Sequence, residues 1–99
     1  MKILKKEKNG AVVLEIEGRL ETGTAPELDA ELGKITRSCS NLVLDFAKLE
    51  YVSSAGLRVL LTAQKSMNAH NGKMVIRNVN DVVKEVFDIT GFTSILTIE

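Results

Sequence analysis

The stretch "EYVSSAGLRVLL", residues 50–61, places two serines and a glycine between a short apolar segment and a longer apolar run. From Ala55 to His70, apolar residues recur at helical spacing. Upstream of the stretch, Leu42–Phe46 is typical of a buried strand. The stretch therefore predicts a junction between a sheet and a helix, at which Ser53 or Ser54 caps the helix.

Further elements are predicted on both sides of this junction. The dipeptide Asn9-Gly10 favours a two-residue hairpin turn, and it joins the β-rich stretches Met1–Lys8 and Ala11–Gly18. The elements predicted after the junction are a strand at Lys73–Arg77, a helix at Asn80–Thr90 closed by Gly91, and a strand at Ile95–Ile98.

A further helix is predicted between the hairpin and the strand Leu42–Phe46. Its start is indicated by Thr24-Ala25-Pro26-Glu27, in which a Thr cap, a Glu three residues later and a Pro in the first turn form a capping box. Its apolar stripe consists of Leu28, Leu32, Ile35 and Cys39. This stripe predicts that the helix packs on a sheet.

The predicted order of elements is ββαβαβαβ, which indicates the α/β class. A chain of 99 residues suffices for one domain, residues 1–99, with a single core. Strands that alternate with helices predict parallel inner strands joined by right-handed crossovers, entered from an antiparallel N-terminal hairpin. We expect a mixed sheet with about three to four helices.

This topology also predicts where a functional surface lies. Parallel strands that end at Gly18, Phe46 and Arg77 have their carboxyl ends at one edge of the sheet. The loops that follow these strands should meet there with three helix N-termini; they are residues 19–23, 47–54 and 78–80. The two serines of the opening stretch belong to this edge.

Composition excludes several classes of partner. Lys plus Arg and Asp plus Glu both number 13, and aromatic residues are 4% of the chain, so neither a basic surface nor a base-stacking platform for nucleic acid is expected. No segment approaches the roughly 20 apolar residues of a membrane-spanning helix, so no membrane insertion is expected. The single Cys39 and the lack of a signal-peptide pattern predict a cytoplasmic location.

The residues around Ser53 and Ser54 argue against a catalytic role for either serine. The Gly-x-Ser-x-Gly elbow of hydrolases would need glycine at position 52, which is Val52. The only histidine, His70, lies 16 residues beyond Ser54, or about 24 Å along a helix. One Cys and one His do not form a zinc site, and no phosphate-binding glycine motif is present. We expect no enzyme activity, no metal and no cofactor.

Phosphorylation is the remaining chemical role to consider for Ser53 and Ser54. A phosphate at a helix start adds about −1.5 to −2 charges where free N–H groups and the helix dipole favour an anion. The fold should tolerate this charge, whereas a docked partner should not. The residues alone therefore leave two roles open for the serines, that of a helix cap and that of a phosphorylation switch.

Three segments resemble the STAS domain family, and most closely its small members that act as bacterial anti-sigma factor antagonists. The resemblance covers essentially the whole chain. It is carried by Gly18-Arg19-Leu20-Glu21 with Thr24-Ala25, by Leu42–Phe46 leading into Tyr51–Leu57, and by Val83-Lys84 with Phe87–Phe92.

The resemblance implies which residues form the site. In the family the serine two positions before the Gly-Leu pair is phosphorylated, which implies Ser54 here; Ser53, where well-known members carry Asp, is the second candidate. The implied partner-binding residues are Glu21, Thr22, Thr24, Ser53, Ser54, Ala55, Gly56, Leu57 and Arg58.

The resemblance also implies partners. The unphosphorylated protein would bind an anti-sigma factor that is also a serine kinase, and so free the sigma factor. Phosphorylation would release the antagonist, and a metal-dependent serine phosphatase would restore it. The alternative is a STAS scaffold or small-ligand-binding subunit of a transport or signalling complex, which needs no phosphorylation.

Overall fold

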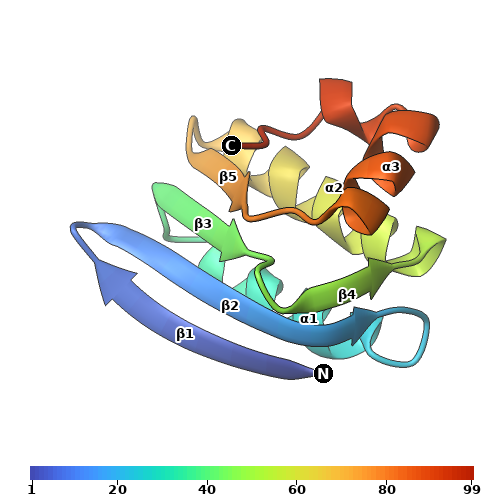
Figure 1. Ribbon diagram of the computed structural model, residues 1–99. Helices are drawn as coiled ribbons and strands as arrows, with labels where there is room; N and C mark the ends of the chain where they lie inside the picture. Colours follow the sequence, from blue (N-terminus) through green and yellow to red (C-terminus); the bar gives the residue numbers. More distant parts are fainter.

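The computed structural model describes residues 1–99 as a mixed β-sheet packed against three α-helices (Figure 1). The strands are β1 (Lys2–Lys8), β2 (Ala11–Leu20), β3 (Asn41–Asp45), β4 (Leu49–Val52) and β5 (Lys73–Arg77). The helices are α1 (Ala25–Ile35), α2 (Ser54–Ala69) and α3 (Asp81–Thr90), followed by the short 3-10 helix η1 (Phe92–Ser94).

The sheet has the order β1-β2-β3-β5, and β4 pairs with β2. Only β1 and β2 are antiparallel, and every other pair of strands is parallel. The hairpin turn has positive φ at Asn9 (52°) and Gly10 (80°), as a tight turn between twisted strands requires. The predicted α/β class, antiparallel hairpin and parallel inner strands are confirmed.

Strand β2 pairs with two strands along its length. Its first part pairs with β3 from Val12 to Glu15, and Gly18–Leu20 pair with β4, with a bulge between Gly18 and Arg19. Gly18 has φ 101°, a conformation that residues with a side chain rarely adopt, and its N–H donates to the Lys48 carbonyl at 3.0 Å. The bulge thereby places the end of β2 beside the end of β4.

One core lies between the sheet and the helices. Alternate strand residues such as Leu14, Ile16 and Leu44 are fully buried, as period-2 geometry requires. The predicted stripe of α1 is buried as well, through Leu28, Leu32 and Ile35. The remaining helical core residues are Leu57, Leu60 and Met67 of α2 and Val83 and Phe87 of α3.

Cys39, predicted as the end of the α1 stripe, lies beyond that helix but belongs to the core, with 9% of its surface exposed. Its Sγ contacts the Asn41 carbonyl at 2.8 Å. The carbonyl of Cys39 itself lies 2.8 Å from Nε2 of His70, just after α2. His70 therefore links the end of α2 to the chain entering β3.

Two predictions about the order of elements were wrong. Residues Leu49–Val52 form the strand β4 rather than part of a loop, so the order is ββαββαβα. The strand predicted at Ile95–Ile98 is reduced to a single bridge between Ile76 and Ile98. Residues 92–94 form a 3-10 turn that directs Leu96 into the core, which leaves too little extended chain for a strand.

The carboxyl end of α3 is held by its own side chains. The Thr93 hydroxyl donates to Asp88 Oδ1 at 2.5 Å, and Lys84 lies 3.3 Å from Asp88 Oδ2. These two contacts, the hydroxyl first, hold the pKa of Asp88 below its usual range. Gly91, with φ 82°, provides the left-handed turn that ends the helix.

Candidate functional site

The junction between β4 and α2 assigns different roles to the two serines. Ser53 has extended backbone angles (φ −97°, ψ 176°), and its N–H donates to the Leu20 carbonyl at 2.9 Å. Its Oγ accepts a hydrogen bond from the Gly56 N–H at 3.4 Å, so Ser53 is the cap of α2. Ser54 is the first residue of the helix and is exposed. Capping therefore leaves the Ser54 hydroxyl free.

The first turn of α2 presents backbone donors without acceptors. The Leu57 N–H donates to the Ser53 carbonyl at 2.9 Å, but the N–H groups of Ser54 and Ala55 have no partner in the protein. No acidic side chain lies in this turn. The turn therefore has the free donors and the positive dipole end that stabilise an anion.

Two of the predicted partner-binding residues lie beneath this surface. Gly56 is buried, and a Cβ at this position would lie 2.7 Å from Leu20 Cγ and 2.9 Å from Val52 Cγ2. Leu57 is only 5% exposed and belongs to the core. Both residues hold α2 close to β2 and β4, and they contribute to the surface only by supporting it.

The turn between β2 and α1 corrects the predicted capping box. Thr24 stands before α1 but makes no side-chain cap bond to the helix. Its Oγ1 instead donates to the Arg19 carbonyl at 2.7 Å and accepts from the Glu21 N–H at 2.9 Å. The hydroxyl is thus used to close the turn that carries Glu21 and the exposed Thr22.

Thr24→Val is expected to loosen this turn. The substitution keeps the size of the side chain but leaves the Glu21 N–H and the Arg19 carbonyl without a side-chain partner, which should cost about 1–2 kcal/mol. Urea denaturation measures this loss. Thr24→Ser retains the hydroxyl and is the matched control; a Val variant as stable as the Ser variant would show that the two bonds contribute nothing.

An aromatic and ionic cluster beside the turn was not predicted. The Arg19 guanidinium lies 4.6 Å from the centre of the Tyr51 ring, and its Nε donates to Glu21 Oε2 at 3.2 Å. The contact exists because parallel pairing of β2 with β4 sets Arg19 opposite Tyr51. Since β4 was not recognised in the sequence, the partner of Arg19 could not be deduced.

Asn80 connects the start of α3 to the same edge of the sheet. Its Oδ1 caps α3 by accepting from the Val83 N–H at 2.8 Å, and its Nδ2 donates to the Leu49 carbonyl at 2.8 Å. The prediction that the 78–80 loop lies beside residues 47–54 is therefore confirmed. The edge is built from the ends of β2 and β4 and the starts of α1, α2 and α3 (Figure 1).

No histidine lies at this edge to act as a general base for either serine. His70 follows the far end of α2, whereas Ser54 begins that helix. No group of three His, Cys, Asp or Glu side chains comes together to hold a metal ion. The arrangement offers an exposed hydroxyl at a helix start that has free backbone N–H donors. As for the membrane, none of the helices has the length and apolar character needed to span one.

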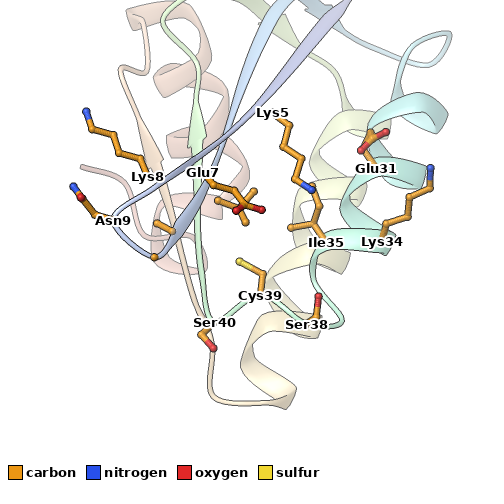
Figure 2. A pocket seen from close by; sticks show the side chains of 13 residues that line it. Lys5, Glu7, Lys8, Asn9, Glu31, Lys34, Ile35, Ser38, Cys39 and Ser40 are labelled. Carbon is orange, nitrogen blue, oxygen red and sulfur yellow. The ribbon is translucent and has the colours of Figure 1, made fainter.

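A cavity of about 600 Å³ lies away from Ser53 and Ser54, between the β1–β2 hairpin and α1 (Figure 2). Lys5 and Glu7 of β1 face Ile35 and Lys34 of α1 across it, with Cys39 at its base. Strand β1 is the edge of the sheet, and its charged side chains discourage pairing with another strand there. None of the residues predicted for the site lines the cavity.

Comparison with known proteins identifies the fold and the family. BtrV of Bordetella bronchiseptica, a proposed anti-sigma factor antagonist, is 34% identical over 99% of this chain and 85% of its own. A proposed anti-sigma factor antagonist from Thermotoga maritima superimposes with a TM-score of 0.90 at 19% identity, over 97% of this chain and 84% of its own.

Phosphorylated SpoIIAA, the Bacillus cell fate determinant, superimposes with a TM-score of 0.76 at 16% identity, over 99% of this chain and 91% of its own. The model of the STAS domain matches residues 2–99. The match spans both the turn that carries Glu21 and the start of α2 at Ser54. The chain belongs to the STAS domain family.

Proposed function

We propose that this protein is an anti-sigma factor antagonist whose binding is switched by phosphorylation of Ser54. The observation that carries the proposal is the exposed Ser54 hydroxyl at the start of α2, separate from the Ser53 cap and beside the turn that carries Glu21. The names of relatives support the role of an anti-sigma factor antagonist. The phosphorylated form of SpoIIAA, a protein of the same fold, supports control by phosphorylation.

In the unphosphorylated state the exposed and half-buried residues of this edge bind the anti-sigma factor. These residues are Glu21, Thr22, Thr24, Ser53, Ser54, Ala55 and Arg58, with Gly56 and Leu57 supporting them from the core. The anti-sigma factor then releases its sigma factor. The partner is itself the serine kinase, as the resemblance of this chain to anti-sigma factor antagonists implies.

Phosphorylation transfers the γ-phosphoryl group of ATP to Ser54 Oγ. The bond between the γ-phosphorus and the β,γ-bridging oxygen breaks, ADP leaves, and the hydroxyl proton passes to a base of the kinase. A metal-dependent serine phosphatase reverses the step, as water attacks the phosphorus and inorganic phosphate leaves. Both reactions take place in the cytoplasm.

The fold survives this modification because the new charge lies at a helix start. The free N–H groups of Ser54 and Ala55 and the positive end of the helix dipole favour the phosphate. A docked partner, in contrast, must desolvate about −1.5 to −2 charges. A penalty of about 3–4 kcal/mol would weaken binding by about 10²- to 10³-fold.

Intact-mass measurement tests the modified residue. Incubation with the anti-sigma kinases of the same organism and ATP should add one phosphoryl group, about 80 Da, to the protein and to Ser53→Ala, but not to Ser54→Ala. A gain that persists in Ser54→Ala and disappears in Ser53→Ala would assign the modification to Ser53. A chain that gains no mass with any of these kinases would favour the non-phosphorylated alternative.

That alternative, a STAS module that binds a small ligand, is favoured by the cavity between the hairpin and α1. The cavity is remote from Ser54, so a ligand there would leave the serine edge unchanged. The two functions therefore differ in which substitutions matter. Substitutions at Lys5 or Lys34 would impair the alternative function, whereas Ser54→Asp would not.

A further inference from the structure

We propose that Arg58 binds the phosphoryl group of phosphorylated Ser54. This inference rests on the proposed phosphorylation of that serine, and it adds a second effect of the modification. Before phosphorylation the Arg58 guanidinium is free at the partner surface. After phosphorylation it is held on the phosphate, so the partner loses a cationic contact and also meets a new anion.

The helix places the two residues together. Arg58 follows Ser54 by four residues within α2, and side chains at this spacing are neighbours with Cβ atoms about 5–6 Å apart. The Cα–Cβ bonds of a helix lean toward its N-terminus, so the Arg58 side chain leans toward the turn that carries Ser54. The length of an arginine spans the remaining distance to a phosphate.

Arg58 has no competing acidic partner. It is exposed, and none of the six ion pairs of the protein includes it. Its guanidinium makes no hydrogen bond within the protein, and the one side chain that bonds to this residue is Thr62, whose Oγ1 donates to the Arg58 carbonyl at 3.0 Å. A phosphate on Ser54 would therefore gain this cation without breaking an existing contact.

The other charged groups of the edge are less suited to this role. Arg19 stacks on Tyr51 and pairs with Glu21, so its charge is already compensated. Lys48, in the loop before β4, lies 3.8 Å from Glu17 Oε1, so its charge is also compensated. Glu50 of β4 and Asp81 of α3 are acidic and would repel a phosphate. Arg58 is thus the cation that the helix itself brings to the modified serine.

The order of the two charges adds to the effect. An acidic group followed by a basic one at i, i+4 is the favourable orientation on a helix, because each charge then opposes the adjacent end of the dipole. The planar guanidinium can also donate two parallel hydrogen bonds to phosphate oxygens, which a lysine ammonium does not reproduce. The contact should therefore depend on arginine rather than on charge alone.

The test uses protein with phosphoserine incorporated genetically at position 54, which requires no kinase. A ³¹P NMR titration gives the second pKa of the phosphate. In Arg58→Gln this pKa should rise by about half a unit, since the nearby cation favours the dianion. Arg58→Lys should restore only part of the difference. Lys65→Gln, with the same charge change farther along α2, should leave the pKa as in the parent protein.

Circular dichroism of the unmodified variants shows whether each keeps its fold. Equal phosphate pKa values in the parent protein and Arg58→Gln would overturn the inference, and so would an equal rise in Lys65→Gln, which would indicate a general charge effect. Because the phosphate is incorporated genetically, this result is independent of the kinase experiment. Failure of phosphorylation at Ser54 by any kinase would remove the proposed function without altering the titration.

Discussion

Ser54→Asp is expected to stay folded and to weaken binding of the anti-sigma factor by at least tenfold, toward the 10²- to 10³-fold loss estimated for the phosphate. The lower limit reflects the single charge of Asp against about −1.5 to −2 for the phosphate. The helix start tolerates the carboxylate, because Asp in the first turn is favoured by the dipole and by the free N–H groups of Ser54 and Ala55. Isothermal calorimetry measures the affinity, and circular dichroism measures the fold.

Two controls separate charge at this edge from charge in general. Ser54→Ala removes the hydroxyl without adding charge and should bind much more tightly than Ser54→Asp. Ser38→Asp makes the same change at an exposed serine that follows α1, at the opposite end of the sheet, and should bind normally. If Ser54→Asp lost its helical signal, the effect would be on folding and the switch would not be a surface property.

Gly56→Ala is expected to lower the free energy of unfolding by about 1–2 kcal/mol. The added methyl group would lie 2.7 Å from Leu20 Cγ and 2.9 Å from Val52 Cγ2, and both of these side chains are buried. Overpacking of this kind costs about 1–3 kcal/mol. The higher helix propensity of alanine offsets at most about 1 kcal/mol of that cost. The cost of overpacking therefore exceeds the gain in helix propensity, and Gly56→Ala should be less stable than the parent protein.

Gly33→Ala in α1 is the matched control for this prediction. Nothing lies within 4 Å of a Cβ at Gly33, so only the propensity term applies and the protein should become more stable. Denaturant unfolding of both variants under one set of conditions gives the comparison. A stabilising Gly56→Ala would mean that α2 does not pack against β2 and β4 as closely as described.

The sequence predicted most elements of the fold because their signals are local. Asn9-Gly10 has the backbone preference of its turn, and Leu28, Leu32 and Ile35 repeat at helical spacing. Strand β4 was missed because its four residues include Glu50 and Tyr51, which do not form an apolar run. Its strand character comes from pairing with the end of β2, and a pairing across the chain leaves no local pattern.

The candidate site was predicted in its position but not in its detailed contacts. Ser53 and Ser54 are equally good caps by composition. The bond of the Ser53 N–H to Leu20 and the bond of its Oγ to the Gly56 N–H show which serine precedes the helix. Thr24 matches a capping box, yet its hydroxyl closes the Glu21 turn because the Arg19 carbonyl lies within 2.7 Å. The stacking of Arg19 on Tyr51 depends on the same unpredicted strand.

The exposed Ser54 hydroxyl, distinct from the Ser53 cap, is the basis of the proposed switch. The most direct measurement compares the affinity of the anti-sigma factor for the unmodified protein and for the protein with phosphoserine at position 54, by calorimetry at one salt concentration. We predict binding that is about 10²- to 10³-fold weaker for the phosphorylated protein. Equal affinities for the two forms would contradict the proposal that phosphorylation of Ser54 controls this partner.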